Sequence, residues 1–289
     1  MLTVVLGFAT SLVYGFADFF GAIASRKIKA VTVTFVAGLS GLSFLLALSI
    51  AMGANFSQEA IFWGVLAGVA SAAAMSALYA SLAIGPISIL SPLSAVISAV
   101  VPMLVGFAQG DRFSLWGFLA LAAILVAIFL VGFVPGDDVR LPSVKGLILG
   151  TAAGVGIGIV LICLDQAPAD SGLASVVLLR AVAATLLGAF TLIMFLRSRK
   201  LASAKPKPQR APLKLWAAVF MAGIFDSSAN VFFLLASRIG SLSVVSVLTA
   251  LYPLGTIILA RIFLKEKIAK TQMIGILIAL AASAVLALG

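Results

Sequence analysis

The sequence of 289 residues is 63% hydrophobic and 10% charged, with a mean hydropathy of +1.27. This composition excludes a water-soluble domain and is typical of a polytopic membrane protein. The net charge of +10 would suggest nucleic-acid binding in a soluble protein, but in a membrane protein basic residues indicate which loops face the cytoplasm. We therefore expect no nucleic-acid partner. One cysteine and no histidine exclude an intramolecular disulfide and the usual metal sites, so we expect no metal and no cofactor.

Apolar runs long enough to cross about 30 Å of hydrocarbon predict an all-α protein with ten transmembrane helices. The predicted helices lie near residues 2–24, 31–52, 60–84, 87–108, 115–133, 145–164, 172–196, 214–237, 242–263 and 271–288. No basic region precedes the first run, and Tyr14 and Asp18 interrupt it. A cleaved signal peptide is therefore not expected, and the first helix is retained.

The first helix carries Tyr14 and Asp18, which are four residues apart and so share one face. Asp18 lies about six residues from the cytoplasmic end of this helix, where a carboxylate is costly unless it faces a wet cavity or a partner. This placement predicts substrate binding by Tyr14 and ion coupling by Asp18. The alternative is structural, with Asp18 reaching the interface or capping a neighbouring helix.

The third helix presents Ser71, Met75 and Tyr79 at intervals of four residues. Such a stripe is more often helix packing than ligand contact. However, an offset of 155 residues aligns Ser71 with Asp226 and Met75 with Asn230, so the same face is strongly polar later in the chain. We therefore keep Ser71 and Tyr79 as candidate substrate-binding residues.

The fourth helix combines Pro92, Ser94 and Pro102 in one span. Proline removes a backbone hydrogen bond and frees a carbonyl, which is tolerated in lipid only where protein or water satisfies it. Pro92 and Pro102 are therefore candidate gating positions, and Ser94 is a candidate substrate-binding residue.

The seventh helix contains Arg180, eight residues from its predicted outer end and roughly 12 Å deep. Among the acidic residues, only Asp226 on the eighth helix is expected at a comparable depth. The two residues are predicted to pair and to take part in coupling, with Asn230 on the same helix as a substrate ligand. The alternative is a structural pair.

The ninth helix carries Tyr252 and Pro253. Tyr252 is predicted to form a flat apolar wall of the substrate site. Pro253 aligns with Ser98 of the fourth helix and is the third candidate gating residue.

The chain contains an internal duplication, because residues 239–288 align without a gap on residues 84–133. We place a first repeat at residues 1–138 and a second at 139–289, each with five helices. Because five is odd, the second copy must enter the membrane in the opposite sense. Inverted repeats of this kind let many secondary transporters expose one midplane site alternately to the two sides.

Loop charges predict the orientation. Of the 19 Lys and Arg residues, 16 fall in or beside loops that follow odd-numbered helices, whereas loops after even-numbered helices carry only Arg112 and Arg238. By the positive-inside rule the odd-numbered loops are cytoplasmic and both termini face outward.

Three segments resemble the EamA-type repeat of the drug/metabolite transporter superfamily: Leu251–Pro253, Leu264–Lys267 and the surroundings of Arg180 in VVLLRAVAATLLG. The resemblance covers nearly the whole chain, twice. The first half departs from the pattern, because VTVTFVAGLSGLSF lacks a matching arginine and Asp111 replaces the usual glutamate. The resemblance implies a small-molecule permease similar to exporters of amino acids and other metabolites, which needs no ATP.

We therefore expect a secondary transporter of the cytoplasmic (inner) membrane that moves a small metabolite, such as an amino acid, by alternating access. Either Asp18 or Asp226 could exchange a proton for substrate, or the protein could be a facilitator. We expect a monomer, with a dimer as the alternative. Other readings are a carrier of lipid-linked or polyprenyl substrates, multidrug efflux, or a non-transporting receptor or assembly protein. An enzyme is not expected, because the sequence has no histidine, thiol dyad or close carboxylate pair.

Overall fold

The computed structural model describes residues 1–25, 27–28, 30–84, 87–132, 142–200, 212–265 and 269–288. This part of the chain is helical and holds no β-strand, apart from one isolated bridge pair. The helices are α1 (Leu2–Ser25), α2 (Ala30–Met52), α3 (Gln58–Ile84), α4 (Ile87–Ala108), α5 (Leu115–Gly132), α6 (Val144–Asp165), η1 (Ala169–Ser171), α7 (Ala174–Lys200), α8 (Leu213–Ser237), α9 (Leu242–Thr249), α10 (Pro253–Leu259), the π-helical η2 (Ala260–Leu264) and α11 (Lys270–Leu288). Each apolar range of the sequence thus coincides with helix, but the range 242–263 is interrupted.

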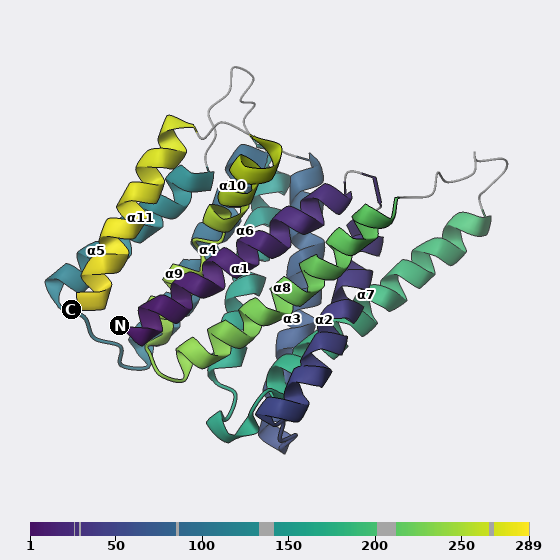
Figure 1. Ribbon diagram of the computed structural model, residues 1–289, viewed down its shortest axis with the longest axis horizontal. Coiled ribbons are helices and arrows are strands. Elements are labelled where there is room, and N and C mark those ends of the chain that lie inside the picture. Colours follow the sequence, from purple (N-terminus) through teal and green to yellow (C-terminus); the bar gives the residue numbers. More distant parts are fainter. Residues whose placement is uncertain are drawn as a thin grey trace.

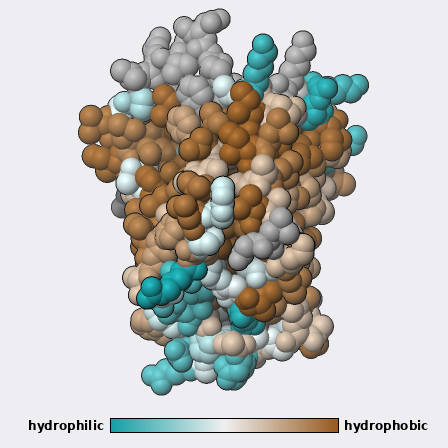
Figure 2. Space-filling model, turned by 90° about the vertical axis from the view of Figure 1, so that its left-hand side faces the viewer, coloured by the Kyte–Doolittle hydropathy of each residue, from teal (hydrophilic) through white to brown (hydrophobic). Residues whose placement is uncertain are grey.

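Seven segments of the described chain are long and apolar enough to cross a membrane, and three further apolar helices are shorter. The shorter ones are Pro92–Ala108, Leu115–Val131 and Lys270–Leu286. Many large apolar side chains are exposed on the bundle, including Phe62, Phe190 and Leu277. Figure 2 shows one face on which hydrophobic residues form a broad band, with hydrophilic residues gathered toward the ends. These features establish a multi-pass all-α membrane protein.

The helices pack mainly across the two halves of the sequence. Helix α1 lies along α8 (Figure 1) and also contacts α9 and α10, while α6 lies along α3 and contacts α4. In the same way α2 packs on α8, and α3 packs on α7. Each of these contacts therefore has a counterpart in which the two halves exchange roles.

Glycines permit two of these close approaches. At Gly15 of α1, an added Cβ would lie 2.6 Å from the Cα of Gly255 in α10. At Gly154 of α6, an added Cβ would lie 2.7 Å from the Cβ of Ile97 in α4. The Gly15 contact also includes the Tyr252 carbonyl, and Tyr252 follows Ile97 by the 155 residues of the sequence duplication. Small residues at these positions let the helix backbones meet.

One end of the bundle holds both termini (Figure 1) and is called the terminal end below. Here the α2–α3 and α6–α7 connections are joined by the bridge between Ala54 and Gly172, and the Leu173 N–H donates to the Gly53 carbonyl at 3.0 Å. Both glycines have positive φ, +79° and +57°, which favours glycine at these turns. The Arg238 guanidinium donates to the Gly172 carbonyl at 2.8 Å. Burial lowers the pKa of this guanidinium.

Two further hydrogen bonds connect segments at the terminal end. The Thr3 hydroxyl donates to the Ile239 carbonyl at 3.3 Å, and the Ser243 N–H donates to the Asp111 carboxylate at 3.1 Å. These bonds join α1 to the α8–α9 connection and the α4–α5 connection to α9. Contacts between distant parts of the sequence therefore join the connections at the terminal end.

Candidate functional site

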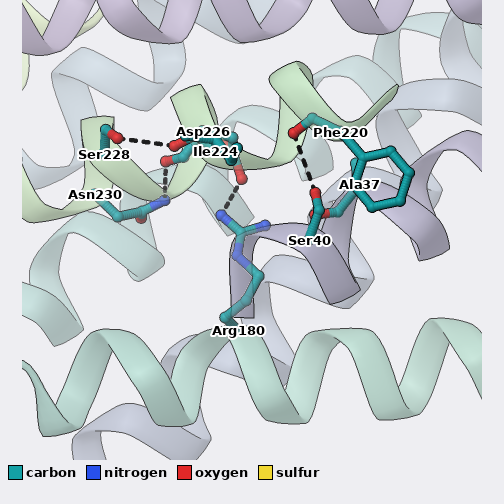
Figure 3. Close-up of polar contacts among 8 residues, drawn as sticks. All are labelled: Ala37, Ser40, Arg180, Phe220, Ile224, Asp226, Ser228 and Asn230. Carbon is teal, nitrogen blue, oxygen red and sulfur yellow. Dashed lines mark hydrogen bonds and ion pairs between the residues drawn. The ribbon is translucent and has the colours of Figure 1, made fainter. Parts of the chain in front are cut away.

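An ion pair joins α7 to α8. The Arg180 guanidinium donates to the Asp226 carboxylate, as Figure 3 shows. The Arg180 side chain is 12% exposed and the Asp226 side chain is 34% exposed. The Arg180 Nε is buried without a hydrogen-bond partner. The pairing expected from the sequence is therefore present, and it balances one positive charge with one negative charge inside an apolar bundle.

Asn230 lies one helical turn after Asp226 and is buried. Its Nδ2 donates to the Asp226 backbone carbonyl at 2.8 Å (Figure 3). The Ser228 hydroxyl likewise bonds the carbonyl of Ile224 in its own helix, at 2.8 Å. Polar side chains of α8 thus donate hydrogen bonds to backbone carbonyls of their own helix around the ion pair. The bond made by Asn230 holds its side chain beside the pair.

Tyr14 and Asp18 on α1 lie near the same pair. The Tyr14 hydroxyl is within electrostatic reach of Asp226, Arg180 and Asp18. The Asp18 carboxyl is likewise within reach of Asp226 on α8 and of Tyr252 after α9. Side chains of α1, α7, α8 and the α9–α10 connection therefore converge, although they come from residues far apart in the sequence.

Asp18 differs from its neighbours in exposure. Its side chain is exposed, whereas Ala17 and Phe19 on either side are 7% and 3% exposed. Its carboxyl is within electrostatic reach of Asp226 and Tyr252, so the side chain lies toward neighbouring helices of the bundle. Within the described residues Asp18 has no ion-pair or hydrogen-bond partner. The structure thus places an accessible carboxylate, unpaired among the described residues, within a membrane-spanning segment.

The connection between α9 and α10 packs directly against α1, where the Tyr252 carbonyl lies beside Gly15. The Tyr252 N–H donates to the Thr249 carbonyl at 3.1 Å, and Pro253 then begins α10. The Thr249 side chain is 3% exposed, and its hydroxyl has no hydrogen-bond partner. The interruption at Pro253 lies at the site, as expected for a residue that removes a helical hydrogen bond.

Other sequence candidates lie elsewhere. The buried Ser94 hydroxyl donates to the carbonyls of Leu90 at 3.0 Å and Gly150 at 2.8 Å, so it serves the α4–α6 contact. Pro92 and Pro102 lie within α4, which continues through both without interruption. Ser71 is half-buried on α3. The side chain of Tyr79 lies outside the described part of the structure.

The charges of the site do not balance. In the part of the chain that the structure describes, two carboxylates, Asp18 and Asp226, accompany one guanidinium, Arg180, so these three ionised groups carry a net charge of −1. No group of three or more His, Cys, Asp or Glu residues that could hold a metal occurs among the described residues. The arrangement is suited to binding a small polar or charged molecule, or a proton, within the bundle.

Sequence reasoning did not identify two polar features, one at the terminal end of the bundle and one near the site. The first is the bond between Asp111 and Ser243, which the duplication could have suggested because it aligns Asp111 with Glu266 and Ser243 with Ser88. The second is the unpaired hydroxyl of Thr249, which aligns with Ser94. In both cases the alignment points to the polar residue but does not show what its side chain contacts.

Comparisons with known proteins agree with this description. Residues 144–288 match the sequence profile of the EamA-like transporter family. A solved structure described only as a crystal structure of a protein has the same fold, with a TM-score of 0.80 and 15% sequence identity over 99% of this chain and 96% of that chain. The comparison with curated proteins found no match.

Proposed function

The chain belongs to the EamA-like transporter family, and from this premise we propose that it moves a small metabolite, such as an amino acid, across the cytoplasmic membrane by alternating access. The helices then count as ten spans, with α9, α10 and η2 forming one broken span. Residues 1–138 and 139–289 form the two inverted repeats of the carrier.

The reciprocal packing of the halves supports this architecture. The pairs α1–α8 and α6–α3 are what an exchange of the two repeats produces, as are the contacts of α1 with α10 and of α6 with α4. The glycine contacts repeat the relationship, since Gly15 and Gly154 approach Tyr252 and Ile97. A site between such repeats can be uncovered on either side by rocking one repeat against the other.

The exposed Asp18 carboxylate carries the functional proposal. A carboxylate in a membrane-spanning helix is expensive to maintain and is expected where it binds a substrate or ion. Asp226 already has Arg180 as its counter-charge. Asp18 is therefore the group that releases a proton when substrate binds and takes one up when substrate leaves. The Ala54–Gly172 bridge joins two connections at the terminal end, and this supports entry of the substrate from the opposite end.

Transport by purified protein in proteoliposomes tests the proposal. Radiolabelled amino acids and amines are supplied outside vesicles loaded with the same unlabelled compounds, with and without a pH gradient. We expect Asp18→Asn to lose accumulation driven by the gradient and to retain exchange, because exchange needs no net change in protonation. Asp165→Asn is the control, because Asp165 lies at the end of α6 and accepts a hydrogen bond from Gln166.

Three outcomes would change the proposal. Loss of both activities in Asp18→Asn, even at saturating substrate, would show that the change disrupts binding or structure as a whole and does not remove coupling alone. Full gradient-driven accumulation by this variant would exclude Asp18 as the coupling group. If wild-type transport did not respond to the gradient, the protein would be a facilitator.

A further inference from the structure

We propose that the substrate carries a cationic nitrogen that binds to Asp18 between the rings of Tyr14 and Tyr252, and that it requires no carboxylate. This inference rests on the proposed transport function and names the substrate class for the same site. It follows from the charges of Asp18, Asp226 and Arg180 and from the aromatic side chains of Tyr14 and Tyr252.

The balance of charges favours a cation. Asp226 and Arg180 neutralise each other through their ion pair, which leaves the Asp18 carboxylate without a counter-charge among the described residues. A cationic substrate supplies the missing positive charge, and a carboxylate inside a membrane-spanning segment is stabilised by an opposite charge. A substrate carboxylate would instead bring a third anionic group to a site with one guanidinium. The unpaired Arg180 Nε does not alter this balance, because the guanidinium carries a single charge.

The aromatic residues around Asp18 suit the same substrate. Tyr14 lies one helical turn before Asp18 on the same face of α1, and Tyr252 in the α9–α10 connection is within electrostatic reach of the Asp18 carboxyl. Aromatic ring faces attract cations, and rings combined with a carboxylate are a common way to bind ammonium groups.

A nearby group of phenylalanines has a different role. Phe225 on α8 stacks on Phe20 with 5.7 Å between ring centroids and meets Phe16 edge-on at 5.7 Å. Phe16 and Phe20 are each two residues from Asp18, so they point to the other side of α1. This group packs α1 against α8 and leaves Tyr14 and Tyr252 as the aromatic groups beside the carboxylate.

Three probes with the same ring and chain separate the charges: phenethylamine, phenylalanine and 3-phenylpropionate. They represent a cation, a zwitterion and an anion. In exchange assays with wild-type proteoliposomes we expect phenethylamine to be transported with the lowest half-saturating concentration and 3-phenylpropionate not to be transported. Asp18→Asn should weaken phenethylamine binding roughly ten- to hundredfold through loss of a charge-assisted contact. Tyr252→Phe keeps the ring and should bind phenethylamine better than Tyr252→Ala.

The failure of this inference and the failure of the transport proposal give different results. Transport of phenylalanine or 3-phenylpropionate without phenethylamine would leave the carrier intact and overturn the cation assignment. Unchanged binding of phenethylamine by Asp18→Asn, in protein that elutes as a single species from size-exclusion chromatography, would overturn the role of Asp18. Transport of none of the three would overturn the substrate class, and absence of flux for all amino acids and amines would also overturn the transport proposal.

Discussion

The Asp111 carboxylate accepts a hydrogen bond from the backbone N–H of Ser243, with 3.1 Å between Oδ2 and N. Ser243 lies in the first turn of α9, and the N-cap residue Ser241 makes no side-chain hydrogen bond to this turn. Asp111, from the α4–α5 connection, therefore supplies the cap that the helix lacks. Its negative charge also complements the positive end of the α9 dipole. One carboxylate thus stabilises a helix start and joins the two halves of the chain.

Removal of this cap should destabilise the protein measurably. Asp111→Ala is expected to cost about 1 kcal/mol of unfolding free energy, and Asp111→Asn should recover part of this because an amide oxygen still accepts the hydrogen bond. Thermal unfolding in detergent measures the change. Gln109→Ala in the same connection is the control, because Gln109 is exposed. Equal stability of Asp111→Ala and the control would show that the contact contributes nothing.

The ion pair between Arg180 and Asp226 should behave as one unit. Arg180→Gln or Asp226→Asn alone leaves an unpaired charge inside the bundle. We expect each to lose roughly 1–3 kcal/mol, less than a fully buried pair would lose, because the Asp226 side chain is 34% exposed. The double variant removes both charges and should be more stable than either single variant. Thermal unfolding of all three tests this, and additive losses would contradict it.

Two glycines of α1 form a matched pair for testing the α1–α10 contact. An added Cβ at Gly15 would lie 2.6 Å from the Thr256 backbone nitrogen, whereas one at Gly21 would meet nothing within 4 Å. Gly15→Ala should therefore destabilise the protein by about 1–3 kcal/mol through overpacking. Gly21→Ala should be neutral or slightly stabilising, because alanine is the better helix former. Fluorescence-detected size-exclusion chromatography after heating compares them, and similar losses for both would refute the contact.

The orientation in the membrane can be tested by cysteine labelling in a Cys163→Ala background. Gln109→Cys lies in the α4–α5 connection, and Lys27→Cys in the α1–α2 connection; both positions are exposed. Because basic residues mark cytoplasmic loops, an impermeant maleimide added to intact cells should label only the cysteine at position 109. Labelling at position 27 alone would reverse the orientation.

Tyr252→Ala should weaken substrate binding while expression and folding are preserved. The ring is half-buried within electrostatic reach of Asp18 and packs against the core only in part, so its removal mainly takes away substrate contact area. Competition binding with the substrate identified by the exchange assay measures the effect. Leu186→Ala, on an exposed surface of α7, is the control. Unchanged affinity would place the substrate away from Tyr252.

The helices and the ion pair were predictable because each depends on a local physical requirement. An apolar run must become helical in lipid, and Arg180 needs a counter-charge that, at its depth, Asp226 alone was expected to supply. The partners of neutral polar groups were not predictable. Ser94 could equally face a ligand or a helix, and only the packing of α4 on α6 shows that its hydroxyl bonds Gly150. The capping of α9 by Asp111 depends on tertiary structure in the same way.

The interleaving of the halves has a consequence for biosynthesis. Helix α1 ends at Ser25, but its main packing partner, α8, ends only at Ser237. At typical translation rates α8 emerges roughly 10–40 s after α1. During this interval Asp18 is already in the membrane, while Asp226 and Tyr252 have not been synthesised. The nascent chain must therefore hold a carboxyl group in lipid, in its neutral form or near the membrane surface, until the second half arrives.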